Sequence, residues 1–161
     1  MSNREFYVQC RQTERPVFLK VLKALPADKL NYKPHDRSPS AEQLVWTLTN
    51  ELKSAIDAVV EKRAEWKSIP APPLDEMIAL FEKYSNELTE RVSAIDDSAW
   101  DSNASFFYNG QKVSEQPISQ FLWMIHFDAI HHRGQLSAYI RPMGGKVPAI
   151  YGPSADERPS A

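Results

Sequence analysis

The stretch PISQFLWMIHFDAIHHRGQLSAYIRPMGG, residues 117–145, decides the fold. Its first proline suits the first turn of a helix, and Pro142 with the glycines at 144–145 ends the helical pattern. Steps of three and four residues follow one apolar line, whose members include Ile118, Phe121, Ile125 and Tyr139. The pattern predicts a long amphipathic helix from about Pro117 to Ile140.

Three earlier stretches show the same helical spacing. They predict a helix over residues 3–25, a second that begins after Ser38 or Ser40, and a third over residues 74–95. Pro16 lies inside the first pattern and predicts a kink or a restart capped by Thr13. Four amphipathic helices bury their apolar stripes most simply against one another. We therefore expect an all-α four-helix bundle.

A different pattern separates the third helix from the last. Asn109 and Gly110 lie between the short runs 106–108 and 111–113, which is typical of a small β-hairpin with a type I′ turn. The chain of 161 residues is expected to form a single domain over residues 1–161, with a frayed tail at 154–161.

Composition excludes several classes of function. The net charge is −2 and no Lys/Arg stripe is present, which argues against nucleic acid as a partner. No apolar run reaches the ~18 residues of a membrane span, and no run near residue 1 resembles a signal peptide. The single cysteine excludes an internal disulfide. We therefore expect a cytoplasmic protein with no membrane partner.

Polar residues fall on the inward lines of two helices. On the last helix, Asp128 and His132 are one turn apart on the apolar line; on the second, Glu51 follows Thr47 by one turn. Burying a carboxylate is costly unless it is paired or bound to a metal, and bundle cores assemble metal sites from facing helices in this way. The spacing alone leaves open a metal pocket or a hydrogen-bonded polar cluster that binds none.

The run from Asp128 to Leu136, which contains His-Arg-Gly-Gln, and the run 139–144 resemble the last-helix signature of the DinB/YfiT-like superfamily. Residues 146–153 and 32–46 fit the same pattern. The resemblance implies a compact four-helix bundle, usually a homodimer, that often holds nickel or zinc on three histidines. Some members are thiol-dependent transferases or isomerases, and the family name does not imply DNA binding.

The sequence departs from the three-histidine pattern. His132 matches the last histidine, but Asp128 and Thr47 occupy the other two positions, and Glu51 follows one turn later. The resemblance therefore suggests Glu51, Asp128 and His132 as metal ligands, with zinc or nickel expected and manganese or iron also suited to this oxygen-rich set. A degenerate site that no longer binds metal is the alternative.

Four further residues are expected beside this pocket. Trp46 and Thr47 precede Glu51, His131 lies beside the inward line, and Gln135 could hydrogen-bond the ligand carboxylates. We expect a metal-dependent transferase or hydrolase acting on an unknown small-molecule ligand, with no catalytic residue assigned. The alternative is a non-catalytic dimer that acts in ligand binding or a stress response.

Overall fold

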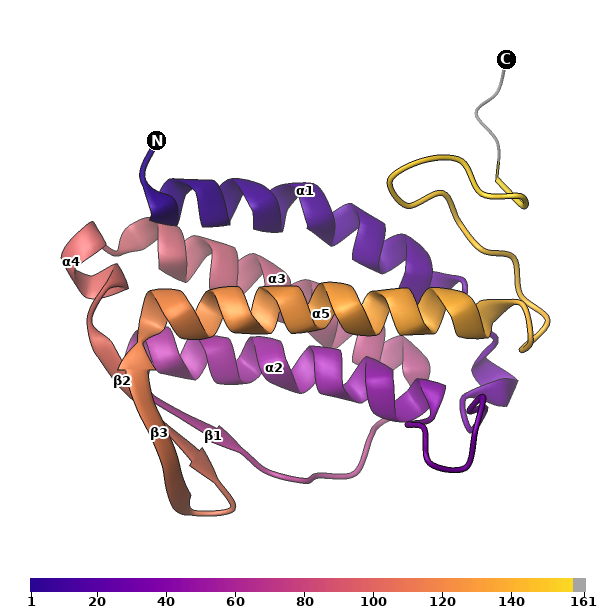
Figure 1. Cartoon of the computed structure of the whole chain (residues 1–161), viewed down its shortest axis with the longest axis horizontal. Helices are drawn as coiled ribbons and strands as arrows, with labels where there is room; N and C mark the ends of the chain where they lie inside the picture. Colours follow the sequence, from indigo (N-terminus) through magenta and orange to yellow (C-terminus); the bar gives the residue numbers. More distant parts are fainter. Residues whose placement is uncertain (158–161) are drawn as a thin grey trace.

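The computed structural model describes residues 1–157, and helices dominate it (Figure 1). The four long helices and two short ones are α1 (Asn3–Lys23), η1 (Ala27–Lys29), α2 (Ala41–Glu61), α3 (Leu74–Ala94), α4 (Asp97–Trp100) and α5 (Ile118–Ile140). The strands are β1 (Arg63–Trp66), β2 (Asn103–Tyr108) and β3 (Gln111–Pro117). The long helices pack side by side around one apolar core.

Local signals place the helix boundaries close to where the sequence predicts them. Ser40 caps α2 in a capping box, because its hydroxyl accepts from the Gln43 amide and the Gln43 side chain accepts from the Ser40 amide. The helix α1 is continuous through Pro16, so no restart occurs at Thr13. Its axis bends in its second half instead (Figure 1).

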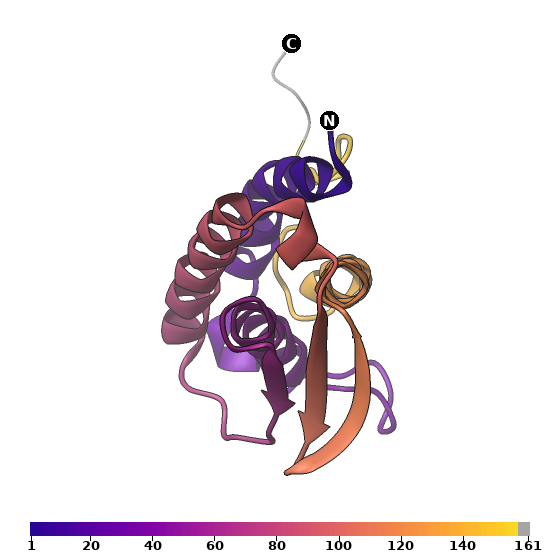
Figure 2. The same cartoon turned by 90° about the vertical axis from the view of Figure 1, so that its left-hand side faces the viewer.

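The predicted hairpin is part of a larger sheet, so the all-α description is incomplete. Strands β2 and β3 are antiparallel, and β1 adds a third strand that pairs parallel to β2. Asn109 and Gly110 form the turn with φ of 47° and 81°, as a type I′ turn requires. The sheet lies against α2 and α5 on the side away from α1 (Figure 2).

A polar seam runs along the most buried line of α5, where it faces α1. His126 and Arg133 are each 2% exposed on this line. The Arg133 guanidinium forms an ion pair with Glu14 and donates a hydrogen bond to Tyr151. Helix α5 is therefore buried along two lines, one against α1 and one toward α2 and the sheet.

The described part of the predicted frayed tail is held in place. The Asp156 carboxylate accepts from the Val147 amide and from Arg141, and that of Glu157 accepts from the Ala149 amide. These bonds fix residues 154–157, and residues 158–161 lie outside the described part of the chain. Among residues 1–157, no helix combines the length and apolar character that crossing a membrane needs.

Candidate metal centre

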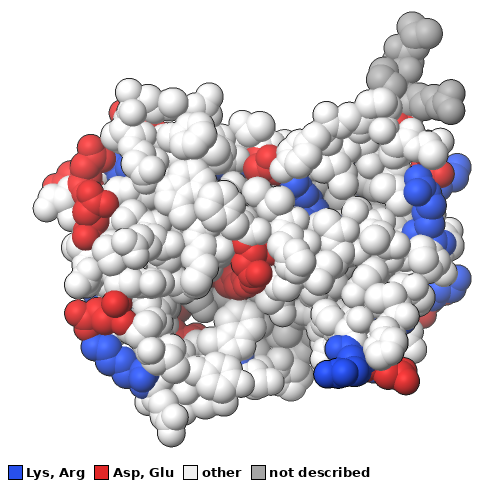
Figure 3. All heavy atoms as spheres, in the orientation of Figure 1, with Lys and Arg blue, Asp and Glu red and all other residues white. Residues whose placement is uncertain are grey.

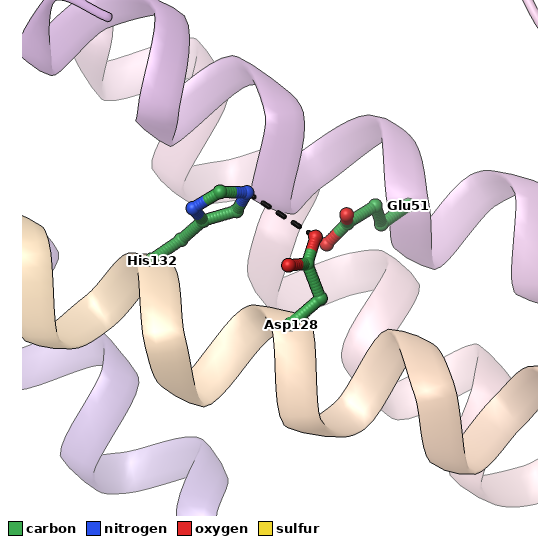
Figure 4. A group of neighbouring side chains, drawn as sticks. All are labelled: Glu51, Asp128 and His132. Atoms are coloured by element: carbon green, nitrogen blue, oxygen red, sulfur yellow. Dashed lines mark ion pairs between the residues drawn. The ribbon is translucent and has the colours of Figure 1, made fainter. Parts of the chain in front are cut away.

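Three side chains from two neighbouring helices meet between α2 and α5. Glu51 comes from the middle of α2, and Asp128 and His132 come from successive turns of α5. One donor atom from each lies within 4.8 Å of the donor atoms of the other two. Figure 4 shows the three side chains pointing toward one another across the gap between the helices.

The His132 ring is oriented by a hydrogen bond on its far side. Nδ1 lies 2.9 Å from Oε1 of Gln135, and in the tautomer with its proton on Nδ1 the ring donates a hydrogen bond to that amide oxygen. The other nitrogen, Nε2, lies 3.2 Å from Oδ2 of Asp128. In the neutral ring, Nε2 then presents a lone pair to a carboxylate oxygen. Two such lone pairs need a proton or a cation between them.

The Glu51 carboxyl lacks the partners that a buried acid needs. Its residue is 9% exposed, and its Oε2 atom has no hydrogen-bond partner. Burial, and then the neighbouring carboxyl of Asp128, raise its pKa to about 9, against a smaller opposing effect of Arg11. Within residues 1–157, no Lys or Arg forms an ion pair with Glu51 or Asp128. A proton on Glu51 or a divalent cation between the two carboxyl groups would satisfy this pair.

The site lies at the wall of an open cavity and not in the apolar interior. The Asp128 side chain is 46% exposed, whereas that of His132 is 18% exposed. Both Glu51 and Asp128 line a cavity of about 1030 Å³ along the start of α5. The expectation of a fully inward Asp128 is therefore wrong, because its side chain faces this open cavity. Figure 3 shows acidic atoms in a hollow of a mostly uncharged face.

The remaining candidate residues divide into two groups. Gln135 contacts the imidazole of His132 and not the carboxylates, and His131 is exposed on the wall of the large cavity. Trp46 and Thr47 line a different cavity of about 280 Å³ beside residues 66–71. There the Trp46 indole donates to the carbonyl of Ile69 at 2.8 Å. The structure thus brings Gln135 and His131 to the site but not Trp46 or Thr47.

Sequence reasoning missed the apolar residues that adjoin the cluster. Met124 and Ile125 of α5 line the large cavity and also a second cavity beneath the sheet, where they meet Phe106 and Phe121. The spacing of Phe121 and Ile125 marked this face of α5 as apolar. That signal did not show that a cavity separates it from the strands.

The donor set fits a divalent metal ion. Two carboxylates and one imidazole nitrogen suit zinc, manganese, iron or nickel better than a soft thiophilic ion. The Oε2 atom of Glu51 has no hydrogen-bond partner and Nε2 of His132 lies 3.2 Å from Asp128, so an ion between them would contact all three side chains. The fold and this cluster define a helical protein with a candidate metal centre between two of its long helices.

The model of the DinB family matches residues 1–159, and the chain belongs to that family. Its fold is similar to that of a DinB-like protein from Bacillus subtilis, with 20% identity, a TM-score of 0.68 and coverage of 86% of this chain and 92% of that chain. A DinB-like protein from Bacillus cereus has 21% identity, a TM-score of 0.73 and coverage of 91% and 97%. No curated protein matches the chain significantly.

Proposed function

We propose that the protein binds one divalent metal ion through Glu51, Asp128 and His132 and acts as a transferase or hydrolase on a small molecule in the adjoining cavity. The observation that carries this proposal is the meeting of one donor atom each from Glu51, Asp128 and His132 within 4.8 Å of one another, with no Lys or Arg of residues 1–157 paired to either carboxyl group. Zinc or nickel is the proposed ion, and manganese or iron would be accepted by the same donors.

A bound divalent ion would lower the pKa of a coordinated water or polarise a carbonyl group. The surrounding residues position the three ligands. Gln135 orients the imidazole of His132 through a hydrogen bond, and Glu51 is buried on α2. A carboxylate of Glu51 or Asp128 that does not ligate the ion would act as the base, and Asp128 is the more exposed of the two to a molecule in the cavity.

A non-catalytic ligand-binding protein is the second candidate. The replacement of two expected histidines by Thr47 and Asp128 supports it, because the site then keeps one imidazole of the three that the family resemblance implies. In either case we propose a homodimer. Phe6 and Phe127, which are 46% and 62% exposed beside the groove between α1 and α5, support this assembly.

Metal content tests the proposal. Protein produced in medium supplemented with zinc, nickel, manganese and iron would be analysed for bound metal, together with Asp128→Ala and His132→Ala. The matched controls are Asp101→Ala, on the cavity wall outside the cluster, and His35→Ala, an exposed histidine in the loop before α2. We expect about one ion per chain in the unaltered protein and both controls, and its loss in the two cluster variants. Metal-free unaltered protein, or equal loss in the controls, would reject the proposal.

A further inference from the structure

A second cavity lies beneath the sheet and joins the candidate metal centre. This cavity, called the inner cavity below, measures about 330 Å³ and lies between α2, α5 and the three strands. Glu51, Met124 and Ile125 line both this cavity and the larger one. The buried, unpartnered carboxyl of Glu51 therefore stands where the two cavities meet. One end of a molecule bound in the inner cavity would therefore contact Glu51 of the candidate metal centre.

The walls of the inner cavity are largely aromatic. Trp66 comes from β1, Phe106 and Tyr108 come from β2, and Phe121 comes from α5. The rings of Phe106 and Phe121 lie 3.7 Å apart between centroids. A cavity of this size matches the lower range of small-molecule sites, and such walls favour a flat apolar group. One or two fused rings would fill the space.

Charge restricts the occupant further. Within residues 1–157, no Lys or Arg lines either cavity, whereas Glu51, Asp101 and Asp128 do. Arg63 of β1 packs its guanidinium over the Phe107 ring, at 3.4 Å from the centroid, and is not part of the lining. An anionic group would lose its hydration without gaining a partner. Figure 3 shows the same imbalance, with acidic atoms in a hollow of a mostly uncharged face.

We propose that the protein takes an uncharged or cationic small molecule that carries an aromatic ring. The ring occupies the cavity beneath the sheet, and the polar group lies at Glu51, beside Asp128. Carboxylated and phosphorylated molecules meet no Lys or Arg in the lining of either cavity, so the metal-free chain disfavours them. The inference names the substrate class for the function proposed above and rests on that function for its chemistry; binding of the ring itself needs no metal.

Three probes with one ring system test the charge preference: 1-naphthylmethylamine, 1-naphthalenemethanol and 1-naphthoate. Each is titrated into the full chain after chelation of metal, with affinity measured by calorimetry and location by chemical shifts. We expect the amine and the alcohol to bind at least about tenfold more tightly than the naphthoate, a difference of about 1.4 kcal/mol. Shifts should concentrate at Phe106, Phe121 and Met124. Equal binding of all three, or no binding, overturns the inference.

Variants test the location. Val113→Lys adds a cation at the exposed edge of the inner cavity and should strengthen naphthoate binding while weakening that of the amine. Val60→Lys is the matched control, because Val60 is similarly exposed on α2 outside the lining, and it should change neither affinity. Ser54→Leu fills the buried wall and should abolish binding of the alcohol, with a thermal melt to show that the chain remains folded.

The outcomes separate this inference from the proposed function. If the protein binds metal but no probe, the substrate class is rejected and the metal centre is retained. The same conclusion follows if probes bind but Ser54→Leu and Val113→Lys leave their affinities unchanged. Probe binding at the lining of the inner cavity in a chain that never takes up metal supports the ligand site and rejects the metal-dependent reaction.

Discussion

The amide oxygen of Gln135 accepts a hydrogen bond from Nδ1 of His132 at 2.9 Å, three residues away on the same helix. In the tautomer with its proton on Nδ1, this bond orients the imidazole ring. It leaves Nε2 directed at Asp128, 3.2 Å from its Oδ2. Partners of this kind hold metal-ligating histidines in one tautomer and one orientation. A substitution of Gln135 therefore tests the candidate metal centre without altering any of the three proposed ligands.

Gln135→Leu should lower metal affinity by about 10- to 100-fold while the protein remains folded, because the imidazole loses the acceptor that orients it. Competition with a chromophoric chelator measures the affinity. Gln135→Glu keeps an acceptor and should retain most of it. Gln120→Leu makes the same change on an exposed part of α5 and serves as the control. A loss of affinity in Gln120→Leu equal to that in Gln135→Leu would show that the hydrogen bond has no role.

The stability of the metal-free protein should fall as pH rises above about 4.5. The pKa of Glu51 is raised from 4.5 to about 9, so between these values the folded chain holds a proton that the unfolded chain releases. Each pH unit then costs up to ~1.4 kcal/mol. Denaturant unfolding at pH 5, 7 and 8.5 measures the slope. Glu51→Gln should remove this contribution and Glu61→Gln, an exposed position on α2, should keep it; identical slopes in both variants would contradict the assignment.

Glu14→Gln should destabilise the fold by about 3 kcal/mol, because it leaves the charge of Arg133 buried with Tyr151 as its remaining polar partner. Chemical unfolding at neutral pH gives the change. Glu87→Gln removes an exposed pair with Arg91 and should cost less than about 1 kcal/mol. Similar losses in the two variants would mean that the seam between α1 and α5 contributes no more than a surface ion pair.

Acid should destabilise the protein partly through His126. Burial, and then the charge of Arg11, lower its pKa from 6.5 to about 4. Between these pH values the His126 imidazole is protonated in the unfolded chain but not in the folded chain. The free energy of unfolding therefore falls as pH drops from 6.5 toward 4. His126→Gln should make this decline shallower in unfolding curves at pH 7, 5.5 and 4.5, with exposed His131→Gln as the control. An unchanged decline in His126→Gln would place the acid sensitivity elsewhere.

Helix boundaries and the inward-facing polar residues of each helix could be predicted because their signals are local, whereas the choice of Glu51, Asp128 and His132 as one set came from the family resemblance. Ser40 and Gln43 form the capping box that starts α2, and the spacing of Asp128 and His132 puts both on one face of α5. The inward position of Glu51 followed from the apolar line of α2. Periodicity and capping carry such information within one or two helical turns.

The strand β1 and the cavity beneath the sheet could not be predicted, because they depend on contacts between distant segments. Residues 63–66 have a weak strand pattern and become a strand only by pairing with residues 105–108. The polar seam between α1 and α5 could not be predicted either, because polarity alone would place its residues at the surface. Arg133 and His126 lie on the most buried line of α5 because Glu14 and Arg11 of α1 meet them there.

Metal binding at the three named ligands is the central claim, and a crystal structure of the zinc-loaded protein tests it most directly. Diffraction data collected above and below the zinc absorption edge locate the ion without reference to the protein atoms. We predict one anomalous peak per chain between Glu51, Asp128 and His132, within about 2.0–2.2 Å of each donor atom. Crystals without a peak there, or with a peak only at other residues, would contradict the account.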